Sequence, residues 1–278
     1  MMVVGTPIGN LGDMSPRAVE ALRSCDFIAA EDTRVTMKLL NHFQIKKPLV
    51  SYYEHNKLER GEMICGRIEA GESCCIVTDA GMPCISDPGE LLVAQCHERN
   101  IPVEVVPGPS AVISALAVSG MSTGRFTFEG FLSMAKKSRR EHLEELKEEK
   151  RTMVFYEAPH KLLSTLKDMA EAFGKERPVA LVKELTKLHE RVVRTTLGEA
   201  AEYFAQEPPK GEFVLILEGK KEEKRRERSL EEAVSLAREL SGGGMSLSEA
   251  ARTAAQRSGF RKGEIYKALL EDNGEEKP

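Results

Sequence analysis

Short apolar runs alternate with amphipathic stretches in the first half of the chain, and this alternation constrains the fold more than any other feature. The apolar runs are Val3–Val4, Phe27–Ala30, Leu49–Tyr52, Cys74–Val77 and Val103–Val106. Between them, apolar side chains recur with helical spacing, as at Ala18, Val19, Ala21, Leu22 and Cys25. Strands that alternate with helices in this way predict a parallel sheet with helices on its faces.

Strand candidates and helical stretches continue to alternate, with a different spacing, beyond the Gly- and Ser-rich stretch at 120–125. The strand candidates there are Phe126–Phe128, Thr152–Tyr156, Val179–Lys183, Arg191–Thr195 and Phe213–Leu217. Helical stretches at about 138–150, 160–173 and 198–206 separate most of them. We therefore predict two α/β domains, 1–122 and 123–219, the second with a more mixed sheet.

A charged segment at 220–228, with six basic and three acidic residues, predicts a linker. Three short helices are expected after it, at 230–240, 247–256 and 265–270. They predict a small helix-turn-helix-like module over 229–272. Its basic residues, Arg257, Arg261, Lys262 and Lys267, make contact with nucleic acid as good a hypothesis as packing on the body of the protein.

The overall charge limits the partners of this chain. Its 278 residues include 40 basic and 44 acidic side chains, a net charge of −4, so it does not coat polyanions in general. Any contact with nucleic acid must use local basic patches. No apolar run approaches the ~20 residues that cross a bilayer, and no signal peptide is recognisable. The six cysteines form no CxxC pair, so we expect reduced thiols, no metal and a cytoplasmic location.

Three loops rich in Gly and Pro follow strands of the predicted parallel sheet, where ligands of such sheets bind. They are Gly5–Asp13, Thr78–Gly89 and Pro107–Ala111. The glycine spacing of the first loop is neither GxGxxG nor that of a phosphate-binding P-loop, which disfavours a dinucleotide enzyme and a P-loop NTPase.

Ionisable residues follow two strands of the predicted sheet, and each could have a purely structural role instead of a role in ligand binding. Asp79 could accept a hydrogen bond from a ligand amine or ribose, or cap its own turn. Glu31, Asp32 and Arg34 could serve a ligand site, but from their spacing alone an N-cap for the next helix is the better reading.

Taken together, the motifs of the chain resemble those of one family. In order they are TPIGNLGD, AAEDTR, SYYEHN, TDAGMPCISDPG, PGPSA, FEGFL, FYEAPH, ELTKLHE and GEFVLILEG. Their order and spacing, from about Val3 to Gly219, are similar to those of the ribosomal RNA small subunit methyltransferase I family. That family belongs to the tetrapyrrole methylase superfamily of S-adenosylmethionine enzymes.

The resemblance implies two αβα domains with S-adenosylmethionine in the cleft between them, and a homodimer. It also implies 2′-O-methylation of a cytidine ribose in the decoding region of 16S rRNA, either naked or in the small ribosomal subunit. The residues expected at the cofactor are Pro7, Asp79, Ala80, Gly81, Met82, Ser110, Ala111, Tyr156, Leu185, Thr186 and Gly211.

The catalytic candidates are chosen for their expected position near this cleft, and the RNA-binding candidates from clusters of basic residues. Methyl transfer to a ribose hydroxyl needs alignment and benefits from a proton acceptor or a cation. The catalytic candidates are Glu31, Asp32 and Arg34 after the second strand, and Glu184 and Lys187 of the ELTK motif. Arg34 and Lys187 could equally contact phosphate. The densest basic clusters suggest an RNA-binding set of Lys136, Lys137, Arg139, Arg140, Arg191 and Arg194, with the 220–228 segment in addition.

Two other functions are compatible with this reading. An enzyme of the same fold could methylate a tetrapyrrole or a protein, because fold alone does not decide the substrate. A protein that keeps the fold but has lost catalysis could bind rRNA during ribosome assembly.

Overall fold

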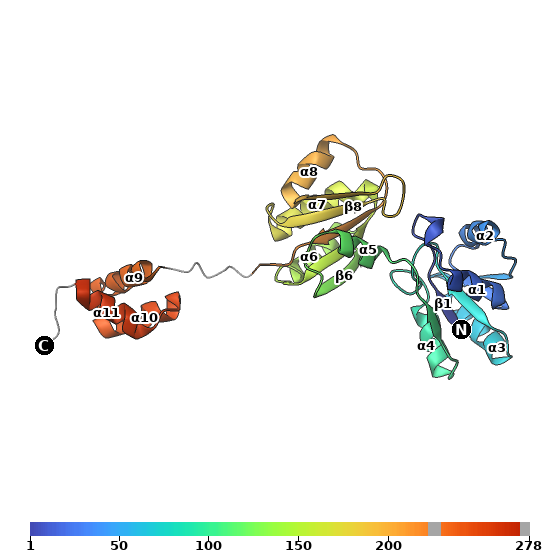
Figure 1. The fold of residues 1–278 in the computed structure, drawn as a ribbon, viewed down its shortest axis with the longest axis horizontal. Coiled ribbons are helices and arrows are strands. Elements are labelled where there is room, and N and C mark those ends of the chain that lie inside the picture. Colours follow the sequence, from blue (N-terminus) through green and yellow to red (C-terminus); the bar gives the residue numbers. More distant parts are fainter. Residues whose placement is uncertain (222–228, 273–278) are drawn as a thin grey trace. The chain divides into compact units, whose positions relative to one another are not determined.

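The computed structural model describes residues 1–221 and 229–272. The chain forms two compact units, Met1–Lys220 and Lys221–Pro278 (Figure 1). Each unit has its own hydrophobic core. The larger unit contains two five-stranded sheets and the smaller one is helical. This confirms the predicted fold class.

The first sheet of the larger unit is entirely parallel, as predicted. Its strands are β1 (Met2–Val4), β2 (Phe27–Ala30), β3 (Leu49–Ser51), β4 (Cys74–Val77) and β5 (Glu104–Val106), in the order β3-β2-β4-β1-β5. The helices between them are α1 (Pro16–Ser24), α2 (Thr33–His42), α3 (Lys57–Glu69) and α4 (Glu90–Glu98), with a short 3-10 helix, η1 (Leu11–Asp13), before α1.

Helices cover both faces of this sheet, which is why its inner strands β2 and β4 are apolar throughout. On one face, Leu22 of α1 and Leu40 of α2 pack with Ile28 of β2. On the other face, Ile64 of α3 and Leu92 of α4 share a core. Consecutive strand residues therefore enter different cores, and both cores are buried.

The second sheet is mixed, as predicted. Its strands are β6 (Phe126–Phe131), β7 (Thr152–Glu157), β8 (Pro178–Lys183), β9 (Arg191–Thr196) and β10 (Phe213–Leu217), in the order β6-β7-β10-β8-β9. Only β6 and β7 are parallel; the other neighbours are antiparallel. One face is covered by α6 (Lys136–Glu145), α7 (Pro159–Phe173) and α8 (Leu197–Gln206).

The other face of the second sheet is covered by α5 (Ala111–Val118). Val112, Ala115 and Leu116 of this helix pack against strand residues that include Val154 and Ile216. Helix α5 follows directly on the third Gly/Pro loop of the first sheet. The segment that leaves the first sheet thus forms part of the core of the second, and this ties the two halves of the larger unit together.

One helix is shorter than its sequence pattern predicts. The expected helix over 138–150 is α6, Lys136–Glu145, and turns replace its last residues. There Glu149 accepts hydrogen bonds from the backbone and the guanidinium of Arg151, at 2.7 and 2.9 Å. The backbone N–H of Lys220 donates to the carbonyl oxygen of Glu149. These local bonds replace the next helical turn.

The smaller unit consists of α9 (Leu230–Gly242), α10 (Leu247–Ser258) and α11 (Lys262–Asp272). Its core is built largely from alanines together with Ile265 and Leu269. Ser246 and Glu249 form a capping box at the start of α10, and Gly259 ends it in the left-handed conformation. The predicted three helices are confirmed. Most of the predicted 220–228 linker lies outside the described residues.

Candidate active site

The first two Gly/Pro loops meet at the carboxyl edge of the parallel sheet. Strands β1 and β4 are neighbours, but the helices that follow them cover opposite faces. This arrangement opens a crevice where an α/β sheet binds its ligand. The loops are joined across it by backbone hydrogen bonds between Thr6 and Gly81, at 2.9 and 3.2 Å. The Thr6 hydroxyl also donates to the carbonyl oxygen of Thr78 at 3.1 Å.

The first and third loops touch through two glycines. A Cβ atom on Gly108 would lie 2.8 Å from the Cα of Gly5, and one on Gly5 would lie 2.7 Å from the backbone N of Gly108. Such distances are far inside van der Waals contact, so only glycine fits at either position. This close approach brings the third loop and the start of α5 to the crevice.

A cavity of about 540 Å³ lies where these loops face the second sheet. Its volume is within the range of roughly 300–1,000 Å³ for small-molecule sites. Eight of the residues predicted at the cofactor line it: Asp79, Ala80, Gly81, Met82, Ser110, Ala111, Tyr156 and Leu185. Sequence reasoning missed several apolar lining residues, including Ile8, Phe131, Val182, Phe213 and Val214.

The lining is acidic. Five carboxylate side chains line the cavity: Glu31, Asp79, Asp87, Glu157 and Glu212. Among the described residues that line it, none is basic. Because opposite charges attract more strongly where water is partly excluded, such a cavity favours a cationic ligand over an anionic one.

Burial and mutual repulsion perturb two of these carboxyls. Burial raises the pKa of Asp87 to about 6, helped by the negative charges of Glu31 and Asp79. Burial also raises the pKa of Asp79, which accepts a hydrogen bond of 3.1 Å from the backbone N–H of Asp32. Glu31 accepts one of 2.6 Å from the Thr78 hydroxyl. Asp87 is thus poised to change its charge close to neutral pH.

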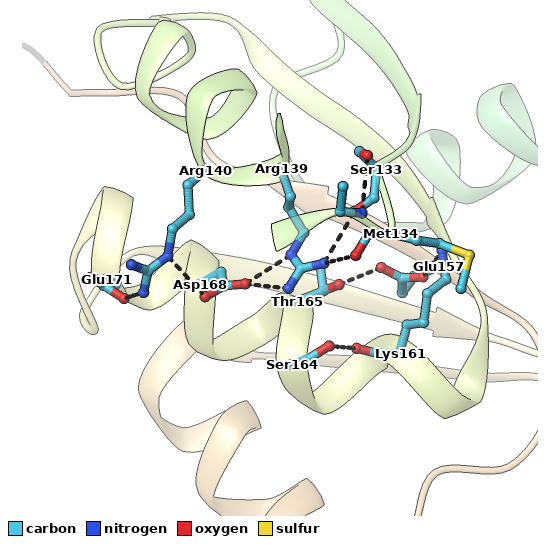
Figure 2. A network of polar contacts seen from close by, with 11 residues as sticks. Ser133, Met134, Arg139, Arg140, Glu157, Lys161, Ser164, Thr165, Asp168 and Glu171 are labelled. Carbon is cyan, nitrogen blue, oxygen red and sulfur yellow. Dashed lines mark hydrogen bonds and ion pairs between the residues drawn. The ribbon is translucent and has the colours of Figure 1, made fainter. Parts of the chain in front are cut away.

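Glu157 is the most enclosed of the five, with its side chain 1% exposed. It lies at the end of β7 and accepts hydrogen bonds from the backbone N–H of Ala158 and the hydroxyl of Thr165 (Figure 2). The ammonium of Lys161 lies 3.4 Å from its carboxylate. These partners fix the carboxylate in the cavity wall. The signal that could have found it was the FYEAPH motif itself.

Three residues predicted at the cofactor do not line the cavity: Pro7, Thr186 and Gly211. Thr186, in the left-handed conformation, lines a separate surface depression beside Pro107–Pro109. Gly211 leaves room for Glu184, whose carboxylate would lie 2.6 Å from a Cβ atom placed there.

The catalytic candidates fall into two ion-paired groups and one residue in the cavity. Glu31 lines the cavity. Asp32 caps α2 and binds the guanidinium of Arg34 at 2.6 Å; this pairing lowers the pKa of Asp32 to about 2. Lys187 bridges Glu184 at 3.1 Å and Glu212 at 2.8 Å. A hydrogen bond from the backbone N–H of Glu212 lowers the pKa of Glu184. The second group thus reaches the cavity only through Glu212.

The predicted RNA contact at Arg139 is corrected by the structure. Its guanidinium is buried and pairs with the carboxylate of Asp168 at 2.6 Å, both side chains being at most 9% exposed (Figure 2). It also donates to the backbone carbonyl oxygens of Ser133 and Met134. Arg139 therefore joins α6 to α7 and the preceding loop. The basic cluster at 136–140 predicts a surface that contacts RNA, but its third basic residue is buried.

The remaining basic candidates are exposed but do not lie together. Lys136 and Lys137 begin α6, just after β6. Arg140 is half-exposed and pairs with Asp168 and Glu171. Arg191 and Arg194 lie on β9, at the opposite edge of the sheet from β6. The structure therefore separates one basic patch near α6 from another on β9.

Within residues 1–221 and 229–272, no group of acidic, histidine or cysteine side chains is arranged to hold a metal ion. In the same residues no helix is long and apolar enough to cross a membrane.

Residues 1–201 match the family model of the tetrapyrrole (corrin/porphyrin) methylases. A solved structure of uroporphyrin-III C-methyltransferase from Thermus thermophilus, complexed with S-adenyl homocysteine, has a similar fold. Its TM-score is 0.55 at 19% identity, over 78% of this chain and 95% of that one. A likeness at this identity shows the fold alone.

Two curated relatives are much more similar, and both are named ribosomal RNA small subunit methyltransferase I. The protein of Synechocystis sp. is 47% identical over 271 residues, 98% of this chain and 97% of its own. That of Thermotoga maritima is 49% identical over 220 residues, 79% of this chain and 98% of its own. The chain thus belongs to the tetrapyrrole (corrin/porphyrin) methylases and, within them, to the ribosomal RNA small subunit methyltransferase I family.

Proposed function

We propose that this protein uses S-adenosylmethionine to methylate the 2′-hydroxyl of a cytidine ribose in the decoding region of 16S rRNA. The family supports methylation of small-subunit rRNA; the cytidine and its 2′-oxygen come from the resemblance of the motifs. The protein acts, in this proposal, as a cytoplasmic homodimer on rRNA or on the small ribosomal subunit.

The acidic cavity is the observation that carries the proposal. S-adenosylmethionine bears a sulfonium and an ammonium against one carboxylate, so it is a net cation. Of the five lining carboxylates, Glu157 and Glu212 are each paired with a lysine. Glu31, Asp79 and Asp87 remain as an excess of negative charge, which suits such a ligand. The acidic lining supports the cofactor and does not by itself choose between RNA and a tetrapyrrole, since both are anions; the RNA reading rests on the family.

The cavity is lined by backbone on one side and by apolar side chains on the other. The contact between Gly5 and Gly108 lets backbone line the crevice closely, and Gly81 with φ of +97° turns the second loop into it. Apolar side chains of β8 and β10, Val182 and Val214, form part of the wall on the other side. The residues that we propose to hold the cofactor are Asp79, Ala80, Gly81, Met82, Ser110, Ala111, Tyr156 and Leu185.

The bound cofactor supplies a methyl group that is already activated by its sulfonium. The protein then has to align the ribose oxygen and accept its proton. Alignment alone can contribute ~7–11 kcal/mol to lowering the barrier. Glu31 and Asp87 are the proton acceptors that we favour, because both line the cavity and the pKa of Asp87 is about 6. The ion pairs of Asp32 with Arg34, and of Lys187 with Glu184 and Glu212, would hold the loops around them.

The proposal is tested by methyl transfer from labelled S-adenosylmethionine to small-subunit rRNA. A 2′-O-methyl group protects the adjacent phosphodiester from alkaline hydrolysis, whereas a methyl group on a base does not. We expect the label in an alkali-resistant dinucleotide. Label in tetrapyrrole or protein would instead support the two same-fold alternatives, and RNA binding without transfer would support the assembly protein.

Replacing Asp79 should weaken cofactor binding. Asp79→Ala removes a cavity carboxylate, and Asp79→Asn keeps an acceptor for the Asp32 N–H but removes the negative charge. Losing a hydrogen bond to a charged group corresponds to a loss of affinity of roughly 10- to 100-fold. Calorimetric titration with S-adenosylmethionine measures it. Asp13→Ala, on the exposed turn of the first loop, is the matched control; wild-type affinity in both Asp79 variants would refute the assigned role.

Reversing the charges of Lys136 and Lys137 should weaken RNA binding and reduce its dependence on salt. Each lost phosphate contact lowers the slope of log K against log salt by about 0.7–0.9, so the pair should lower it by about 1.4–1.8. Filter binding at several salt concentrations measures the slope. Lys46→Glu/Lys47→Glu, before β3 and so at the amino edge of the first sheet, is the control. Equal slopes in the two double variants would exclude the α6 patch.

A further inference from the structure

Phe131 is unusually exposed for a phenylalanine. Its side chain is 57% exposed, and it nonetheless lines the acidic cavity. It therefore stands at the open side of the cavity rather than in its depth. Phenylalanine is mostly buried in folded proteins, because transfer of its apolar ring out of water lowers the free energy. An exposed ring at the mouth of a ligand site suggests that a ligand covers it.

A β-bulge directs this ring toward the cavity. In the pairing of β6 with β7, Phe128 lies opposite Val154, Gly130 opposite Phe155 and Phe131 opposite Tyr156, so Glu129 is an extra residue. Regular alternation would place Phe131 on the opposite face from Phe128. The bulge, with Gly130 at φ of +63°, returns it to the face of Phe128 and Tyr156. Bulges beside active sites commonly re-aim a side chain in this way.

The Phe131 ring packs against another aromatic ring and lies near a lysine ammonium. Its centroid lies 5.3 Å from that of Tyr156, which itself contacts Phe128 at 5.0 Å. The ammonium of Lys161 lies 5.8 Å from the Phe131 centroid. Helix α6, with Lys136 at its start, follows only a few residues later. An aromatic ring beside cations is the usual composition of a site for single-stranded nucleic acid.

We propose that Phe131 is a stacking platform for the base of the nucleotide whose ribose is methylated. The proposal rests on the proposed function. A ribose hydroxyl can reach a cofactor inside the cavity only if its nucleotide leaves the surrounding RNA structure. The base then loses its stacking partners, and an aromatic ring at the cavity mouth replaces them. In this role Phe131 is a substrate-positioning residue.

The experiment compares Phe131→Ala, Phe131→Leu and Phe131→Tyr with the wild type. Stacking of a base on an aromatic ring is worth ~1–3 kcal/mol, which corresponds to about 5- to 150-fold. We expect Phe131→Ala and Phe131→Leu to lower kcat/KM for rRNA by that factor while the Kd of S-adenosylmethionine stays within about twofold. Phe131→Tyr should restore most of the rate. Tyr203→Ala removes an aromatic side chain of the same 57% exposure from α8 and should change neither value.

An RNA with an abasic target nucleotide makes the test specific. It keeps the 2′-hydroxyl but has no base to stack. The wild type should therefore methylate this RNA more slowly than the intact RNA, and Phe131→Ala should be no slower on it than the wild type. Three results would overturn the inference. The first is unchanged RNA kinetics in Phe131→Ala, and the second is full activity of Phe131→Leu. The third is a parallel loss of cofactor affinity in Phe131→Ala, which would assign the ring to the adenine of the cofactor. If the wild type methylates no RNA at all, the proposed function itself fails, and the two failures are thereby distinguished.

Discussion

Replacing Arg139 by methionine is expected to lower the free energy of unfolding of the larger unit by about 3–5 kcal/mol. The change leaves the Asp168 carboxylate, 8% exposed, without its principal cation. Removing one partner of a buried ion pair has an effect of this size because the remaining charge stays buried. Domains are stabilised by only ~5–15 kcal/mol, so the variant should unfold at a much lower urea concentration. Chemical denaturation followed by circular dichroism measures the shift.

The control for this prediction is the neighbouring arginine. Arg140→Met breaks ion pairs of a side chain that is 46% exposed, and it should cost no more than about 1 kcal/mol. The double variant Arg139→Met/Asp168→Leu removes both buried charges and should recover most of the lost stability. If Arg139→Met were as stable as Arg140→Met but bound RNA less tightly, the residue would be a surface contact after all.

Replacing Gly108 by alanine is expected to reduce affinity for S-adenosylmethionine on the order of 100-fold. The new Cβ atom would lie 2.8–3.0 Å from the Cα, C and O atoms of Gly5. These atoms are backbone, so the first and third loops must move apart. A displacement of about 1 Å at a site can lower a reaction rate about 100-fold, and we expect the contacts that bind the cofactor to be weakened to a similar extent. Overpacking should also destabilise the fold by about 1–3 kcal/mol.

Gly66→Ala is the matched control for this substitution. Gly66 lies within α3, and no atom lies within 4 Å of a Cβ placed on it. The change should stabilise the helix by up to about 1 kcal/mol and leave cofactor binding unchanged. Calorimetry gives the affinity and thermal denaturation the stability of both variants. Wild-type affinity in Gly108→Ala would show that the close approach of the two loops does not shape the site.

The pattern of apolar residues was enough to predict both sheets, because buried strands leave a strong local signal. Phe27–Ala30 and Cys74–Val77 are apolar on both faces, as parallel strands between helix layers must be. We predicted a mixed second sheet because helical stretches separate most, but not all, of its strand candidates. The packing of α5 on that sheet could not be predicted, since an apolar helix does not reveal which core it enters.

The candidate site was predictable where backbone conformation demands particular residues. Glycines and prolines mark the three loops, and eight of the residues predicted from the motifs line one cavity. Side-chain pairing was not predictable. Arg139 resembles its basic neighbours in sequence, and only the buried Asp168, 29 residues later, shows its structural role. Asp87 became a candidate only when its burial and the neighbouring charges were known.

The net charge of −4 hides two local features that matter for function. The cavity collects five carboxylates, whereas Lys136 and Lys137 form an exposed basic pair at the start of α6. A cationic cofactor and an anionic RNA would thus be attracted to different parts of the same unit. Charges in separate places allow both ligands to bind without competing for the same groups.

The most direct test of this account follows a labelled methyl group from S-adenosylmethionine into small ribosomal subunits and, in parallel, into naked 16S rRNA. The account predicts label at a single cytidine of the decoding region, recovered as 2′-O-methylcytidine in an alkali-resistant dinucleotide. It also predicts that Asp79→Ala abolishes most of this label and that Asp13→Ala does not. Label on a base, on protein or nowhere in the wild-type reaction would contradict the account.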